Sequence, residues 1–190
     1  MQYLVFKPTD ILDFNFISFF ASWFMHGSVS HLIGNVIAIM VMGRVVERKM
    51  GFAKTALIYF GAGAIANLFS ALIYLFIIGT NTGGIGASGC VMGLIAAAIL
   101  LDPFYISFET IIPMPIITTG LLYIWSDITG VLTMADDNIG HFAHIGGFIS
   151  IPILMYLFTK KDRNRFIRGM VIDALLISGA IIIYVLVKQY

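Results

Sequence analysis

Long apolar stretches separated by short polar connections dominate this sequence. A bilayer core about 30 Å thick requires roughly 20 mostly apolar residues for each helical crossing. By this measure we predict six membrane-spanning helices, at residues 31–46, 53–78, 88–101, 111–132, 142–158 and 167–187. The third is short for a full crossing, so we expect it to begin part-way down inside the bundle. The expected fold class is an all-α polytopic membrane protein, with residues 1–190 as a single domain.

The N-terminal residues and the overall composition fit this fold class. Residues 15–25 are rich in aromatic side chains and too short to span, which indicates an interfacial segment within a loop over residues 1–30. The chain is 59% apolar and 11% charged, with a mean hydropathy of +0.97. A net charge of +1 leaves no field to attract nucleic acid. The single cysteine, Cys90, excludes an intrachain disulfide and a cysteine metal cluster.

Lysine and arginine gather in two of the connections. They are Arg44, Arg48, Lys49 and Lys54 between the first two spans, and Lys160, Lys161, Arg163, Arg165 and Arg168 between the last two. Because basic residues favour cytoplasmic loops, both connections should be cytoplasmic. Both chain termini then lie outside.

Polar residues lie at or near the entering ends of three spans. His31 and Asn35 begin the first, Ser88 begins the third and His144 begins the fifth. In the predicted topology all three spans enter from the outer face, so these residues converge on one depth in or just below the outer leaflet. Polar groups inside a membrane face protein or water and mark functional sites. We therefore expect a site on the outer side.

Small residues explain how two of these helices could approach closely. Gly89, Gly93 and Ala97 recur at four-residue spacing in the third span, and Ala143 and Gly147 do so in the fifth. Such stripes allow membrane helices to touch backbone to backbone. If they face each other, the serine and histidine beside them can meet at about 2.6 to 3.2 Å, as a nucleophile and its general base do.

Donors for a developing oxyanion lie in the first span. His31 and Asn35 share one helix face because they are four residues apart. Their N–H groups, with the backbone N–H of Ser88, would hold the negative oxygen of a tetrahedral intermediate.

No acidic residue is expected to join the serine and histidine. Asp127, Asp136 and Asp137 fall in or near an outer loop, so a serine–histidine dyad is predicted rather than a triad. His141 and His144 are three residues apart and could ligate a metal from one helix face. However, the HExxH phrase is absent, and no acidic residue lies nearby in sequence within a span. We therefore expect no metal and no cofactor.

Four phrases together resemble the rhomboid intramembrane serine proteases. They are GASG at residues 86–89, AHIGG at 143–147, HGSVSHLIGN at 26–35 and GRVVERKMG at 43–51. Their order and spacing match over about residues 1–158. The resemblance implies a six-helix rhomboid-like bundle with its catalytic core at residues 31–158. It also implies functional residues, namely Ser88 as nucleophile, His144 as general base, and His31, Asn35 and the Ser88 amide as oxyanion donors.

The supporting residues and the interfacial loop combine matches with departures from the family pattern. His26 matches a further family histidine with a structural or supporting role, and Gly86 opens the serine motif. Met92 stands where the family often has an aromatic residue, four positions after the nucleophile. In the interfacial loop, Ile17 and Ser18 replace a tryptophan and an arginine often found there.

The family core begins with a span ahead of the interfacial loop, whereas residues 1–25 here have the character of that loop. The last span, at residues 167–187, runs from the cytoplasm outward, which is the direction expected of that first helix. One hypothesis is that it takes the place of this helix, as a natural circular permutation. The alternatives are an added peripheral helix or a chain truncated before its first helix.

These features predict an intramembrane serine protease of the cell membrane, whose partners are the lipid bilayer and transmembrane protein substrates. It would cleave membrane helices of other proteins near the outer leaflet. The substrate would enter near the fourth span, and a loop at about residues 129–140 would cap a cavity open to the outside. The alternatives are a catalytically silent rhomboid-like protein that binds membrane helices, and a small transporter or channel. The physiological substrate and the oligomeric state stay open.

Overall fold

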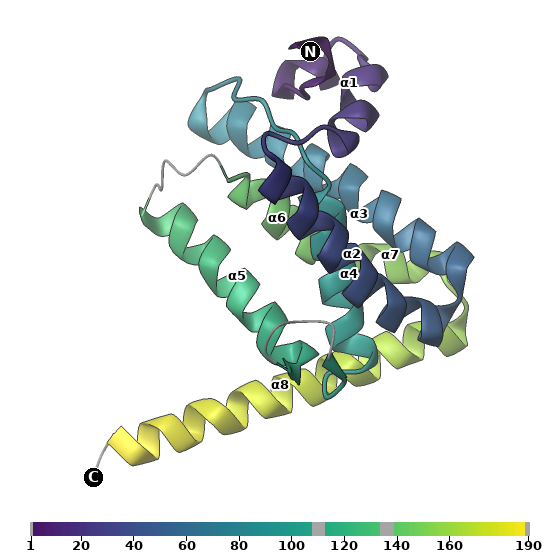
Figure 1. Cartoon of the computed structure of the whole chain (residues 1–190). Coiled ribbons are helices and arrows are strands. Elements are labelled where there is room, and N and C mark those ends of the chain that lie inside the picture. Colours follow the sequence, from purple (N-terminus) through teal and green to yellow (C-terminus); the bar gives the residue numbers. More distant parts are fainter. Residues whose placement is uncertain (1, 108–112, 134–138, 189–190) are drawn as a thin grey trace.

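The computed structural model describes residues 2–107, 113–133 and 139–188, and it shows a bundle of helices (Figure 1). Within these described ranges, four helical segments are long and apolar enough to cross a membrane. They are α2 (Val29–Met50), α3 (Phe52–Leu72) with its π-helical continuation (Ile73–Ile78), α5 (Ile116–Thr133) and α8 (Lys160–Lys188). Two shorter apolar segments are α4 (Ser88–Leu101) and the stretch His141–Leu157. The predicted all-α membrane fold is confirmed.

The N-terminal residues form short turns at one end of the bundle (Figure 1). Their elements are η1 (Gln2–Leu4), η2 (Pro8–Ile11), α1 (Phe16–Ala21) and η3 (Ser22–Phe24). The backbones of Phe6 and Gly84 exchange two hydrogen bonds, of 3.2 and 2.8 Å. The side-chain amide of Asn67 in α3 donates to the carbonyl oxygen of Phe19 at 2.9 Å. This segment is therefore anchored both to α3 and to the loop that precedes α4.

Helix α4 is the core of the bundle, with eleven of its fourteen residues buried. It packs against α2, α3, α5, α6 (His141–Phe148) and α8. A Cβ atom added at Gly147 of α6 would collide with the carbonyl oxygen of Gly89, and one added at Gly93 would lie 3.5 Å from the carbonyl oxygen of Gly147. The small residues of α4 and α6 therefore face each other as predicted, with backbone against backbone.

The fifth predicted span is not one continuous helix. Helix α6 ends at Phe148, and the chain then turns into α7 (Ile151–Leu154) and η5 (Met155–Leu157). Pro152 has no N–H, so it cannot donate the backbone hydrogen bond that would continue a helix begun before it. The hydroxyl of Ser150 donates to the carbonyl oxygen of Gly147 at 2.6 Å, which satisfies one acceptor that the break exposes.

Between α4 and α5 the chain forms two short antiparallel strands, β1 (Ile106–Ser107) and β2 (Met114–Pro115). The predicted start of the fourth span, at residue 111, lies outside the described residues. Helix α5 begins at Ile116, directly after β2.

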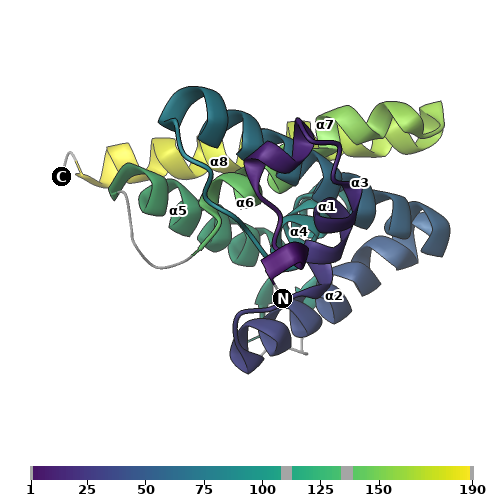
Figure 2. The same ribbon diagram turned by 90° about the horizontal axis from the view of Figure 1, so that it is seen from above.

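Helix α8 lies at the edge of the bundle. It crosses the end opposite the N-terminal segment, and in the view from above α8 and α2 lie on opposite sides (Figure 1, Figure 2). Gly169 packs against the carbonyl oxygen of Leu100, whereas almost every residue described after Asp173 is exposed. The hypothesis that α8 takes the place of a helix beside the interfacial segment is therefore wrong. This helix meets α4 only near its own beginning, so it is peripheral.

Ion pairs join the elements at the α8 end of the bundle. Lys49 Nζ lies 2.7 Å from Asp102 Oδ2, and Lys54 Nζ lies 2.5 Å from Asp162 Oδ2. The guanidinium of Arg165 donates to the carbonyl oxygen of Lys49 at 3.0 Å. These contacts connect α2, α3 and the end of α4 to the first turns of α8.

Candidate active site

The first turn of α2 positions His31 and Asn35. Ser28 caps this helix, because its hydroxyl accepts the backbone N–H of His31 at 3.1 Å. The ring of His26 packs edge-on against that of His31, with 5.0 Å between the ring centroids. Asn35 is buried, and its Nδ2 has no hydrogen-bond partner among the described residues. Nδ2 is therefore an N–H donor available to a ligand.

The loop that leads to α4 lies directly on these two side chains. Gly86 has a φ of +118°, and its N–H donates to the carbonyl oxygen of Ser22 at 2.8 Å. A Cβ atom at Gly86 would lie 2.7 Å from Cε1 of His31 and 3.8 Å from Nδ2 of Asn35. Only glycine suits both this backbone angle and this close approach. Gly86 therefore holds the start of the serine motif against His31 and Asn35.

Ser88 is the first residue of α4, at the bottom of a loop that runs down into the bundle (Figure 1). The first N–H groups of a helix have no partner within it, and they form its positive end. The residue before the helix, Ala87, supplies no side-chain cap. The half-buried hydroxyl of Ser88 thus lies beside backbone donors that can receive a negative oxygen.

His144 lies on α6, next to the point where α6 touches α4. A Cβ atom at Gly89, the residue after Ser88, would be 3.6 Å from the carbonyl oxygen of Ala143, the residue before His144. Ser88 and His144 therefore lie at the same level on two helices in backbone contact.

A buried aspartate contacts His144, contrary to the sequence analysis. Oδ1 of Asp127 lies 2.8 Å from Nδ1 of His144 and 2.9 Å from Nδ1 of His141. Asp127 belongs to α5 rather than to a loop, and it is only 3% exposed. The prediction that no aspartate is placed beside the histidine was therefore wrong for Asp127. Asp136 and Asp137 lie outside the described residues.

The helical phase of α5 is the sequence signal that could have revealed Asp127. The buried residues of α5 are Ile116, Gly120, Asp127 and Gly130. Their spacings of four, seven and three residues define one helix face. A Cβ atom at Gly130 would collide with the ring of His141, so this glycine makes room for that ring. One carboxylate on an otherwise apolar inward face indicates a specific polar partner.

The same three side chains are a candidate metal centre. The possible ligand atoms of Asp127, His141 and His144 all lie within 4.8 Å of one another. Imidazole and carboxylate suit zinc, so these residue types fit such an ion. The sequence analysis considered only the two histidines, and it did not expect a carboxylate from another helix beside them.

The remaining predicted residues support the packing. Met92 is buried one turn after Ser88, with its Cβ against Gly147. Cys90 is fully buried, and its sulfur lies against Gly63 of α3. Cys90 therefore acts as a small core residue.

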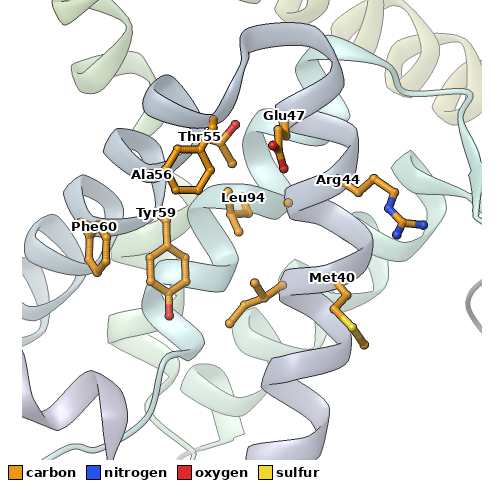
Figure 3. Close-up of a pocket in the computed structure, with 11 residues that line it drawn as sticks. Met40, Arg44, Glu47, Thr55, Ala56, Tyr59, Phe60 and Leu94 are labelled. Carbon is orange, nitrogen blue, oxygen red and sulfur yellow. The ribbon is translucent and has the colours of Figure 1, made fainter.

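A cavity of about 520 Å³ opens between α2 and α3 (Figure 3). Its lining is mostly apolar, with Tyr59 and Leu94 inside and Arg44 and Glu47 on α2. The cavity contains none of the predicted site residues, so the candidate active site is elsewhere, where α2, α4, α5 and α6 meet.

Comparison with known proteins identifies the family. Residues 13–161 match the family model of the Rhomboid domain. The chain is 33% identical to RHOMBOID-like protein 4 of Arabidopsis thaliana over 75% of its own length and 34% of that protein. It is 30% identical to the rhomboid protease AarA of Providencia stuartii over 86% of its own length and 64% of that protein. It thus spans between a third and two thirds of these relatives. The chain is a multi-pass membrane protein that belongs to the rhomboid family.

Proposed function

We propose that this protein is an intramembrane serine protease, in which Ser88 is the nucleophile and His144 the general base. His31, Asn35 and the backbone N–H of Ser88 stabilise the oxyanion, and His26, Gly86 and Met92 support the site. The observation that carries the proposal is the packing of Gly86 on His31 and Asn35, while α4 and α6 touch next to the serine and the histidine. Similarity to a rhomboid protease supports it.

The reaction is acyl transfer to serine followed by hydrolysis. Nε2 of His144 takes the proton of the Ser88 hydroxyl as its oxygen bonds to the peptide carbonyl carbon. The oxyanion donors hold the negative oxygen, and removal of one such donor typically costs about 10²- to 10³-fold in rate. His144 then protonates the leaving amine as the C–N bond breaks. Water later attacks the acyl ester and regenerates the serine.

We propose that the substrate is a transmembrane helix of another protein. It enters the site near α5 and is cut near the outer leaflet. Small or helix-breaking residues near the cut favour cleavage, because a helical peptide bond must unwind before its carbonyl is accessible. Water reaches the site through a polar opening on the outer face, since polar backbone at membrane depth must be buried or line water.

The orientation follows from the charges. The paired basic residues at the α8 end of the bundle mark the cytoplasmic side. The active site then faces the outside of the cell membrane, where the N-terminal segment also lies. The expectation that the C-terminus lies on that side too does not fit this structure, because α8 runs along the opposite, cytoplasmic end of the bundle (Figure 1). We propose that residues 1–190 act as one domain, with residues 1–30 at the outer interface, residues 31–158 as the catalytic core and residues 167–187 as an additional span.

Purified protein in detergent or vesicles, incubated with a fluorescent transmembrane substrate, tests the proposed function. We expect cleavage by the wild type and a loss of at least about 10³-fold in both Ser88→Ala and His144→Ala. Ser178→Ala, which removes an exposed hydroxyl from α8, is the matched control and should cleave normally. A serine-directed fluorophosphonate should label the wild type but not Ser88→Ala.

Two results would contradict the protease. If the wild type neither cleaves nor is labelled but still binds the transmembrane helix, the protein is a catalytically silent rhomboid-like binding protein. If Ser88→Ala retains full cleavage, another group is the nucleophile and the assignment of Ser88 is wrong.

A further inference from the structure

We propose that Asp127 is a positioning residue for His144, so that Ser88, His144 and Asp127 act as one catalytic unit. This inference rests on the proposed function, because it adds a residue to that reaction. It concerns a side chain on α5, whereas the nucleophile and the base lie on α4 and α6.

The burial of Asp127 requires an explanation. A carboxylate inside a membrane bundle is costly unless it is hydrogen-bonded or paired. Asp127 is 3% exposed, and its Oδ1 is shared by the Nδ1 atoms of His141 and His144. Its Oδ2 is buried with no hydrogen-bond partner among the described residues. The two imidazoles are therefore the groups that stabilise this carboxylate.

The hydrogen bond selects one tautomer of His144. An ionised carboxylate only accepts hydrogen bonds, so Nδ1 of His144 must carry the proton in the 2.8 Å contact. Nε2 of the neutral ring then has a free lone pair. A general base toward serine needs this lone pair, and the carboxylate also fixes the plane of the ring.

The carboxylate also stabilises the charge that forms during the reaction. When Nε2 accepts the serine proton, the ring becomes a cation with Asp127 Oδ1 at 2.8 Å from its Nδ1. Opposite charges at this distance attract more strongly around a buried carboxylate than they do in water. The proton stays on Nε2 until the amine leaves with it, and Asp127 stays ionised throughout. No proton transfer to the carboxylate is needed.

His141 has a different part in this arrangement. It precedes His144 by three residues on the same helix and binds the same oxygen at 2.9 Å. Its ring is buried against Gly130 of α5. His141 thus holds the same carboxylate oxygen through a second contact, which restricts Asp127 to the position that His144 requires.

Hydrogen bonding explains this cluster better than a metal ion does. Each Nδ1 lies at hydrogen-bond distance from a single carboxylate oxygen and carries a proton toward it, whereas a nitrogen that binds a metal ion must have no proton. A bound metal would also occupy a nitrogen of the residue that serves as general base. Metal binding by this cluster is therefore an alternative that the test below distinguishes from the positioning role.

The test compares Asp127→Asn and Asp127→Glu with Ser126→Ala, an exposed neighbour on the same helix. We expect Asp127→Asn to lower kcat by about 10²- to 10⁴-fold with little change in KM, because the amide keeps the shape but not the charge. The fluorophosphonate labelling rate of Ser88 should fall in parallel. Asp127→Glu should restore part of kcat, and Ser126→Ala should match the wild type.

A second measurement does not depend on activity or on the folding of a variant. NMR of the wild-type protein with ¹⁵N-labelled histidine reports which ring nitrogen of each histidine carries the proton. The signals of His144 are identified by their absence in His144→Ala. We expect a protonated Nδ1 and an unprotonated Nε2 in resting His144. The opposite tautomer would overturn the positioning role even if the protein is an active protease.

The outcomes separate this inference from the proposed function. If the wild type cleaves and Asp127→Asn keeps its kcat while unfolding at a lower temperature, Asp127 only joins α5 to α6 and the positioning role is wrong. If a chelator abolishes wild-type cleavage and zinc restores it, the cluster is a metal site and the positioning role is again wrong. If the wild type neither cleaves nor is labelled, the proposed function itself fails.

Discussion

The polar residues at the two ends of the helix bundle are arranged in opposite ways. At the α8 end, Lys54 pairs with Asp162 and Lys49 pairs with Asp102. At the end with Ser88, Asn35 Nδ2 and His26 Nε2 are buried without a hydrogen-bond partner among the described residues. Pairing satisfies these four charged groups at the first end, although Asp173 of α8 is buried with neither carboxylate oxygen hydrogen-bonded among the described residues. The second end keeps donors that only a ligand or water can satisfy.

This difference has an energetic meaning. A buried donor without a partner costs about 1–3 kcal/mol of stability, so a fold keeps it only where another demand requires it. Active sites meet this condition, because donors prepared for a transition state cannot be used up by the resting protein. The ion pairs at the α8 end have the simpler task of joining α2, α3 and α4 to α8. The comparison predicts that variants at one end affect catalysis and variants at the other affect stability.

Among the variants that test this comparison, Asn35→Ala should have the largest effect on kcat. We expect kcat to fall by about 10²- to 10³-fold, because one of the proposed oxyanion donors is lost. The free energy of unfolding should change by less than about 1 kcal/mol, since the amide donor removed has no partner to lose.

Asn67→Ala is the matched control for Asn35→Ala. The Asn67 amide donates to the carbonyl oxygen of Phe19, so its loss should reduce stability by about 1 kcal/mol and leave kcat within about threefold. Steady-state kinetics and thermal unfolding in detergent measure both quantities. Equal losses of kcat in the two variants would remove the distinction between a donor kept for catalysis and a structural donor.

A somewhat smaller effect on rate is expected from Gly147→Val, which separates α4 from α6. Its side chain would collide with the carbonyl oxygen of Gly89, next to Ser88. A misplacement of about 1 Å can cost about 10²-fold in rate, and overpacking costs about 1–3 kcal/mol of stability. Gly179→Val in α8 is the control, because nothing lies within 4 Å of a Cβ atom there. Normal cleavage by Gly147→Val would show that this contact does not position the site.

The smallest effect on cleavage is expected from Lys54→Met, at the α8 end. Its partner Asp162 has a side chain only 6% exposed, so the variant should lose about 1–2 kcal/mol of stability with kcat unchanged. Lys49→Met removes a pair whose side chains are 44% and 30% exposed, and it should cost less than about 1 kcal/mol. Thermal unfolding compares the two variants. A large loss of kcat in Lys54→Met would mean that the two ends do not act separately.

Much of the fold was predictable because local patterns govern it. Apolar length determines which segments can cross a bilayer, and each of the six predicted spans overlaps an apolar helical segment among the described residues. The small residues around Gly89 and Gly147 predicted a backbone contact that the structure contains. The break after Phe148 was missed because the fifth span was assigned from its apolar length alone. Pro152 lies in that span, and its missing N–H favours the end of a helix before it. The place of α8 was missed because hydropathy gives no direction of packing.

The sequence by itself determined the membrane class and which segments form apolar helices, and it predicted the grouping of Ser88, His144, His31 and Asn35 near helix starts, because these depend on residue type and spacing. Only the tertiary structure decided that Asp127 meets His144. That contact joins α5 to α6, and the connection between them includes residues outside the described ranges. The contact depends on how α5 and α6 are rotated about their own axes. Spacing along the chain cannot specify such a rotation, since packing between helices sets it.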